Sequence, residues 1–182
     1  MPKISAEIKN QIAALSKIEL EEIVTKMAAK EKTVFDYLLV NYFEKETGEN
    51  ELFEKTKMDL DLLFRKSYKG FSEKLQLANM ISACVKRINE FSKICKNKHL
   101  EADLLMYVLE IPFSLSTNMF GTCFTAYDYK VGLMVKRVIT IVQTKLHPDY
   151  KIEYAEKIND YLTILHRTSN HIDFIYGLPK SI

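Results

Sequence analysis

The stretch Ile111–Tyr127, IPFSLSTNMFGTCFTAY, has no charged side chain in a chain of which 27% is charged. A run of this kind is either buried or part of a functional surface. The residues before it keep helical spacing, and this spacing continues through Pro112. Proline removes a helical hydrogen bond and clashes with the preceding turn. We therefore expect a kink near residues 108–112, or a break there followed by a short second helix that ends near Gly121.

Helices are expected on both sides of this stretch, because apolar residues recur at spacings of three and four. The segment from Ser72 to about Asn97 carries an apolar seam that would face a partner helix within a bundle. The segment from Thr125, with Asp128 at a capping spacing, to about residue 146 has the widest apolar surface. We expect that helix to be central, and one last helix to run from about residue 151 to 176.

Shorter helices are expected before residue 70. Ser5 is a possible N-cap, and Ser16 with Glu19 has the spacing of a capping box. Thr33 with Asp36 repeats this spacing for a third helix, which we expect to stop in the segment KETGEN at Gly48. A fourth helix would run from about residue 51 to 68.

The fold class that follows is all-α, a bundle or irregular array of about seven to eight helices with the last four longest. No segment shows a convincing two-residue alternation, and no Asn-Gly or Asp-Gly hairpin turn occurs. A length of 182 residues suits one domain. We expect 1–182 to form one domain, with 1–69 as a short-helix N-terminal subdomain and 70–182 as the main bundle.

Composition excludes several classes of protein. The net charge of +2 indicates no general affinity for nucleic acids or membranes. The N-terminus has no apolar signal segment, and no apolar run reaches spanning length. Three cysteines without a CxxC pair suit reduced thiols, so we expect a soluble cytoplasmic protein. With five glycines and no G-x-S-x-G or P-loop, we expect no cofactor and no ordinary hydrolase or kinase activity.

Several segments resemble a family of small, all-helical bacterial proteins of unknown function. They are LSKIELEEIVTKM at 15–27, VFDYLL at 34–39, the long run at 88–129 that begins INEFSKICKNKHLEADLL, and NHIDFIYGL at 170–178. The resemblance covers nearly the whole chain in the same order. It implies an all-helical fold and a bacterial cytoplasm, and it implies no activity.

The resemblance extends to individual positions. The family usually has Glu, then Phe, Thr and Asn, then Gly in its central stretch, and the matching residues here are Glu110, Phe113, Asn118 and Gly121. Its closing segment usually places an acid directly after a His. Here Ile172 follows His171, which departs from that pattern.

A polar row inside the charge-free stretch is the first candidate site. If the helix continues past Pro112, Glu110, Ser114, Thr117 and Asn118 fall on one face. In one interpretation these groups satisfy one another inside the core. In the other they form a small-ligand or partner pocket, with Glu110 and Asn118 as anchors and His171 as a further member.

A metal site is a weaker hypothesis. His166, Asn170 and Asp173 share one face of the expected last helix, and His99 with Asp103 offers an i, i+4 pair on another. No established metal-binding spacing such as H-E-x-x-H is present. We therefore expect no metal.

A basic block lies between residues 61 and 100, which hold nine basic and three acidic residues. Its candidate surface consists of Arg65, Lys66, Lys69, Lys86, Arg87, Lys93 and Lys96. Such a surface could meet phosphates, or it could be a solvated face or one that meets the acidic N-terminal helices of the same or another chain. The pI of 8.3 and the absence of interleaved aromatic residues favour the second interpretation.

The function that we predict from the sequence is therefore a non-catalytic helical interaction or scaffold module, with self-association or a protein partner. The first alternative is a small-ligand or metal-binding protein, or an enzyme, with a polar pocket near Pro112. The second alternative is nucleic-acid binding through residues 65–98.

Overall fold

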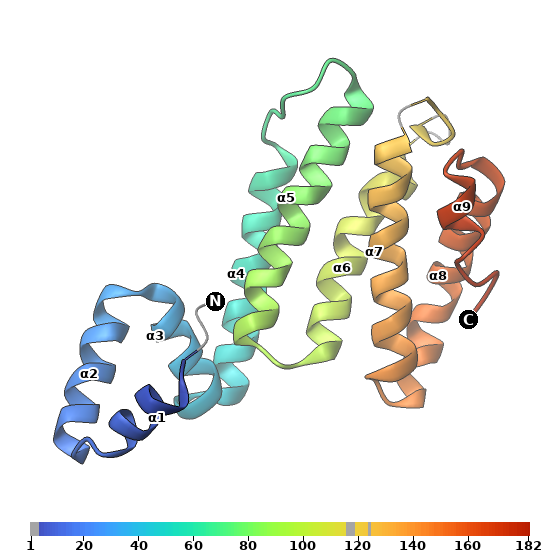
Figure 1. Ribbon diagram of the computed structural model, residues 1–182. Coiled ribbons are helices and arrows are strands. Elements are labelled where there is room, and N and C mark those ends of the chain that lie inside the picture. The colour runs from blue at the N-terminus through green and yellow to red at the C-terminus, as the bar shows by residue number, and fades with distance from the viewer. Residues whose placement is uncertain (1–3, 116–118, 124) are drawn as a thin grey trace. The chain divides into compact units, whose positions relative to one another are not determined.

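The computed structural model describes residues 4–115, 119–123 and 125–182, with only the backbone of residues 45 and 46. Regular structure in these ranges is helical and no strand occurs there, which confirms the all-α class (Figure 1). In chain order the elements are α1 (Ala6–Ala13), α2 (Lys17–Lys30), α3 (Lys32–Leu38), the π-helical turn η1 (Leu39–Phe43), α4 (Lys45–Phe64), α5 (Glu73–Ile94), α6 (Lys98–Ser114), α7 (Thr125–Thr144), α8 (Pro148–Thr168) and α9 (Ile172–Ile175).

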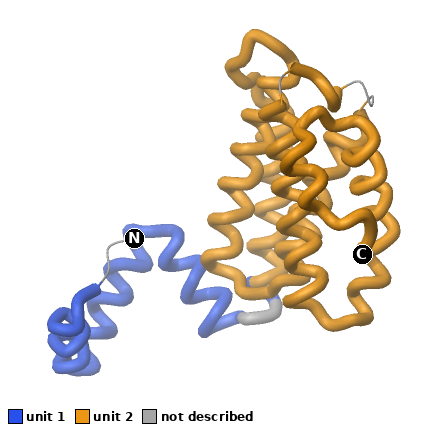
Figure 2. The backbone as a smooth tube through the Cα atoms, turned by 45° about the vertical axis from the view of Figure 1, so that its right-hand side comes forward, with its two compact units in different colours: residues 1–48 blue, residues 49–182 orange. Residues whose placement is uncertain are grey.

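The chain divides into two compact units, Met1–Gly48 and Glu49–Ile182 (Figure 2). This boundary lies earlier than the one expected near residue 69, because α4 is bonded to the second unit. Arg87 Nε on α5 donates to Asp59 Oδ2 at 2.8 Å, and Tyr107 Oη on α6 donates to Asp61 Oδ1 at 2.5 Å. Helix α4 is therefore part of the larger bundle.

Helix α7 is the centre of the second unit, as its wide apolar surface predicts. It packs against α5, α6, α8 and α9, and Figure 1 shows α5 to α8 side by side. Val131, Val135, Val138 and Val142 are fully buried along it. Each buried valine contributes on the order of 1.5–3 kcal/mol through removal of its side chain from water.

The predicted seam on α5 is buried inside this same unit. Ile81, Cys84, Ile88 and Phe91 have at most 1% of their surface exposed, and α5 packs on α6 and α7. The apolar seam of α5 is therefore covered by other helices of the same chain.

Capping motifs in the sequence predicted the starts of three helices correctly and the start of one helix wrongly. Ser5, Ser16 and Ser72 are N-caps, and Ser16 with Glu19 forms the expected capping box. The expected cap at Thr33 is wrong, because α3 already begins at Lys32.

The segment KETGEN does not end a helix as expected. It forms the first turns of α4, so Gly48 lies inside a helix. A Cβ atom there would lie 3.3 Å from Val40 Cα, so glycine permits η1 to approach α4 closely. Glu44 N donates to Leu39 O at 2.9 Å, the i to i+5 bond of a π-helical turn. The capping and turn rules do not anticipate this turn.

Two further differences concern the helices around the charge-free stretch. Helix α6 continues through Pro112 and ends at Ser114, where Leu115 takes an extended conformation. The single last helix expected over residues 151–176 is wrong: α8 ends at Thr168, Ser169 is extended, and α9 begins at Ile172. The residues at this break bond to α7 instead of continuing the helix.

Glu101, in the first turn of α6, is a buried carboxylate with 4% of its surface exposed. Arg137 Nη2 on α7 donates to its Oε1 at 2.7 Å, and Lys98 Nζ donates to its Oε2 at 2.5 Å. Burial disfavours the charged carboxylate, but these hydrogen bonds outweigh burial and hold the pKa of Glu101 below its ordinary value of 4.5. Arg137 Nη1 also donates to Asn89 Oδ1 on α5 at 2.6 Å, so one side chain links three helices.

This arrangement predicts the pH dependence of stability. The unfolded chain protonates Glu101 at a higher pH than the folded chain does, because the folded pKa is lowered from 4.5. The stabilisation is therefore complete above about pH 4.5 and is lost as the pH falls through the lower folded value. In urea unfolding between neutral pH and pH 3, the Glu101→Gln variant should lose less of its unfolding free energy on acidification than the unsubstituted protein.

The matched control is Glu110→Gln, since Glu110 sits in an exposed ion pair with Lys157. Exposed pairs contribute about 0–1 kcal/mol, so this control should follow the unsubstituted protein. If the unfolding free energies of Glu101→Gln and of the unsubstituted protein fall in parallel as the pH is lowered, Glu101 does not carry this pH dependence.

Candidate functional site

Glu110, the first residue of the predicted polar row, lines an open cavity of about 350 Å³ in the second unit. Its side chain is 51% exposed and pairs with Lys157 Nζ on α8 at 2.9 Å. The lining residues come from three helices: Phe53 and Lys57 of α4, Asp103, Met106, Tyr107 and Glu110 of α6, and Glu153, Tyr154 and Lys157 of α8. Glu110 therefore lies at a solvent-accessible surface and not in a buried network.

Ser114 and His171, two other residues of the predicted pocket, do not line this cavity. Ser114 is exposed, and its Oγ donates to Ile111 O at 3.0 Å within the last turn of α6. Thr117 and Asn118 lie outside the described residues. His171 is absent from the cavity lining, and its ring stacks on Tyr129 of α7 with centroids 5.1 Å apart.

Sequence reasoning missed the aromatic residues that close this cavity. Tyr154 Oη donates to Asp103 Oδ1 at 2.5 Å, and Tyr107 Oη donates to Asp61 Oδ1. The bond to Asp61 raises the pKa of Tyr107 to about 12, and burial followed by the Asp103 bond raises that of Tyr154 further. Both phenols are therefore protonated donors at neutral pH. Tyr150, Tyr154 and Lys157 recur at helical spacing on α8, but the sequence alone does not say which helix they face.

The predicted pair of His99 and Asp103 forms, and α8 adds a third group. His99 Nδ1 lies 3.3 Å from Asp103 Oδ2, and His99 Nε2 lies 3.6 Å from Glu153 Oε2. The imidazole separates the two carboxylates, so the donor atoms do not converge on one point as metal ligands must. Within the described ranges, no group of three or more His, Cys, Asp or Glu side chains could hold a metal ion.

The second predicted metal set is also dispersed. His166, Asn170 and Asp173 were placed on one helix face, and the break after Thr168 removes that face. His166 Nε2 lies 3.2 Å from Pro179 O, and Asn170 Nδ2 donates to Gly121 O.

The end of the charge-free stretch is held by Asp128, which is fully buried on α7. Its Oδ2 accepts from Gly121 N at 3.1 Å, Ser169 Oγ at 2.8 Å and Asn170 N at 3.2 Å. Asp128 was expected to cap its own helix. Instead it ties the loop before α7 to the turn after α8, which explains why α8 stops there.

The basic block is not one uniform surface. Arg87 is used inside the bundle, where its Nη2 donates to Thr56 Oγ1 at 2.9 Å and its Nε donates to Asp59. The other six candidates are exposed: Arg65, Lys66, Lys69, Lys86, Lys93 and Lys96.

The first unit presents a different candidate site, an exposed apolar surface. Helices α1, α2 and α3 contain no buried side chain. We call its exposed large hydrophobic side chains the N-terminal apolar surface: Ile4, Ile8, Ile12, Ile18, Ile23, Val24, Met27, Phe35, Tyr37, Tyr42 and Phe43. Of the 21 exposed large hydrophobic side chains in the described part of the chain, these 11 fall in little more than a quarter of its length.

Gly121 provides a test of the Asp128 arrangement. Its φ of +71° favours glycine, and a Cβ atom would lie 2.2 Å from Thr168 O. Gly121→Ala should lower the free energy of unfolding by at least about 1–3 kcal/mol, the cost of the conformation alone. Gly177→Ala is the control, because Gly177 has no positive φ. Equal urea midpoints for the two variants would contradict this account.

Comparison with known proteins found no relative: no family model, no curated protein and no solved structure matches the chain.

Proposed function

We propose that this chain is a non-catalytic helical interaction module whose first unit pairs with the same unit of a second copy. The observation that carries the proposal is the N-terminal apolar surface, most of which lies on α1, α2 and α3, three helices without a buried side chain. Contiguous exposed apolar surfaces of soluble proteins mark interaction sites.

The energetics of short helices support this proposal. Helices α1, α2 and α3 have 8, 14 and 7 residues. Isolated helices shorter than about 12–15 residues are marginal in water, and packing of an apolar face supplies most helical stability in proteins. The capping box at Ser16 contributes only on the order of 1 kcal/mol. Covering the apolar surface contributes about 25 cal/mol for each Å² removed from water.

The charges of the first unit favour a second copy as the partner. Residues 1–48 hold seven lysines and eight acidic residues, a net charge of −1. On α2, Lys17 pairs with Glu21 and Lys26 pairs with Glu22, so these charges are matched within the helix. A partner therefore needs an apolar helical face and no strong charge, which the same unit of another copy offers. Twofold pairing of identical surfaces is the commonest form of homo-oligomer.

We also propose a bacterial cytoplasm as the location, supported by the family resemblance and by the free thiols. Burial raises the pKa of the Cys84 thiol to about 12 and that of Cys95 to about 11, so neither is a reactive thiolate at neutral pH. Separately, no helix in the described ranges has the length and apolar character needed to cross a membrane.

The proposal predicts reversible self-association. In sedimentation equilibrium over about a hundredfold range of concentration, the unsubstituted chain should show a monomer–dimer equilibrium. The double variant Ile23→Glu, Met27→Glu should weaken it by at least about tenfold, equivalent to about 1.4 kcal/mol, because both side chains are exposed on α2.

The control is Ile152→Glu on α8, which places a glutamate on an exposed apolar residue of the second unit. It should leave the dimer unchanged. A monomer at every concentration, or equal weakening by the control, would contradict pairing through the first unit.

A further inference from the structure

A separate feature of the second unit is an apolar groove between α5 and α7 with a volume of about 400 Å³. Ile81 and Met134 form its buried floor, and Val85 and Leu133 line its sides. Leu133 is 41% exposed, and Tyr129, which also lines the groove, is 39% exposed. The volume falls within the range of about 300–1,000 Å³ that is usual for small-molecule sites.

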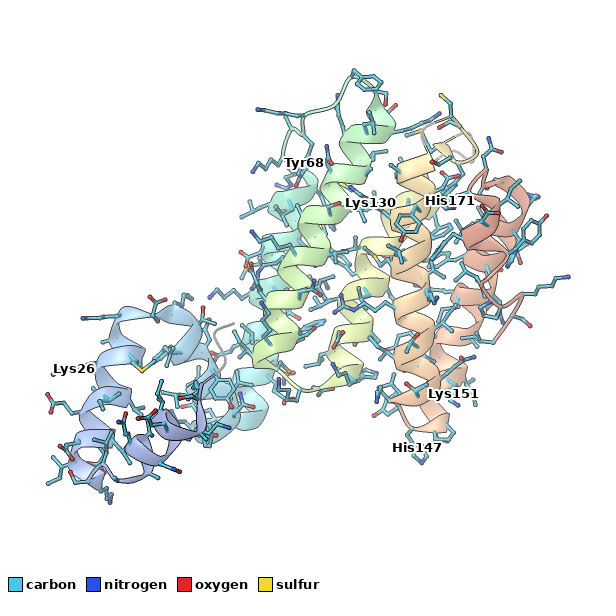
Figure 3. All side chains as sticks on the ribbon, in the orientation of Figure 1. Lys26, Tyr68, Lys130, His147, Lys151 and His171 are labelled. Atoms are coloured by element: carbon cyan, nitrogen blue, oxygen red, sulfur yellow. The ribbon has the colours of Figure 1, made fainter. Side chains whose placement is uncertain are left out.

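Two polar donors meet at one end of this groove. Lys130 Nζ, which extends from α7 towards α5 (Figure 3), donates to Ala78 O at 3.2 Å. Ser82 Oγ on α5 donates to the same oxygen at 2.9 Å, so the ammonium and the hydroxyl lie close together. An ammonium carries three donors, and a carbonyl oxygen does not neutralise its charge.

The charge of Lys130 has no counter-ion in the groove. No acidic residue lines the groove, and no ion pair of Lys130 is found in the described structure. Arg137 lines the other end, but its guanidinium is held by Glu101 and Asn89. The groove therefore combines an apolar trough with a single uncompensated cation.

The length of the trough follows from the same contacts. Lys130 meets Ala78, and Arg137 meets Asn89, so α5 and α7 run in the same direction beside the groove. Seven residues separate Lys130 from Arg137, which is about 10 Å along a helix.

We infer that this groove binds a small anionic amphiphile, in which a carboxylate contacts the Lys130 ammonium and a hydrocarbon part lies over Leu133 and Val85. A charge-assisted hydrogen bond fixes the carboxylate at one end. Removal of the hydrocarbon and of the exposed Leu133 surface from water supplies the remaining affinity. This site is distinct from the N-terminal apolar surface and from the cavity beside Glu110.

Decanoate, below its micelle concentration, is the probe for this site. With ¹³C-labelled methionine methyl groups, decanoate should shift the Met134 signal saturably, because Met134 lies on the groove floor. Decyltrimethylammonium, which has the opposite charge, should shift it far less. Absence of a saturable Met134 shift, or an equal response to the cationic amphiphile, would overturn the inference.

Substitutions of two lysines on α7 complete the test. Lys130→Met should weaken decanoate binding by at least about tenfold, and Lys130→Arg should retain most of it. The control is Lys136→Met, since Lys136 lies over the Phe174 ring of α9 and not in the groove. Equal weakening by both methionine variants would overturn the inference, as would a Met134 shift caused only by acidic helical peptides.

Discussion

Helix α7 carries apolar side chains around most of its circumference, and the need to cover them determines how the second unit is built. Helices α5, α6, α8 and α9 all pack on it. Two polar side chains of α7, Arg137 and Asp128, are bonded to its neighbours. Arg137 joins Glu101 of α6 and Asn89 of α5, and Asp128 holds the turn after α8. The burial of Glu101 is tolerated because Arg137 and Lys98 match its charge with direct hydrogen bonds.

The first unit differs from the second in how its apolar side chains are covered. Its three α-helices carry apolar stripes and bury no side chain. Four charges of α2 are paired within that helix and the net charge of the unit is only −1, so apolar side chains are what this unit leaves exposed. That contrast is the reason for proposing an interaction module. The second unit covers its apolar faces with its own helices, whereas we propose that the first unit pairs its apolar faces with a second copy.

Sequence periodicity predicted the features that depend on local spacing. It predicted the all-α class, the central α7 and the buried α5 seam, because burial along a helix recurs every three or four residues. It also predicted the capping box at Ser16, because that motif has a fixed local spacing. Sequence periodicity failed where contacts outside a single helix determine where that helix begins or ends. The break after Thr168 depends on the bonds of Asp128 to Ser169 and Asn170, and the continuation of α4 through Gly48 depends on the approach of Val40.

The candidate site shows the same limit: helical spacing placed Glu110 and Ser114 on one face, but Glu110 pairs with Lys157 of α8 while Ser114 bonds to Ile111 of its own helix. The central claim is that the N-terminal apolar surface is covered by a second copy. Hydrogen exchange of the backbone amides of α2, measured on the full chain at low and high protein concentration, tests it most directly. The account predicts that α2 amides gain protection as concentration rises while α6 amides do not change. Exchange of α2 that is independent of concentration would contradict the account.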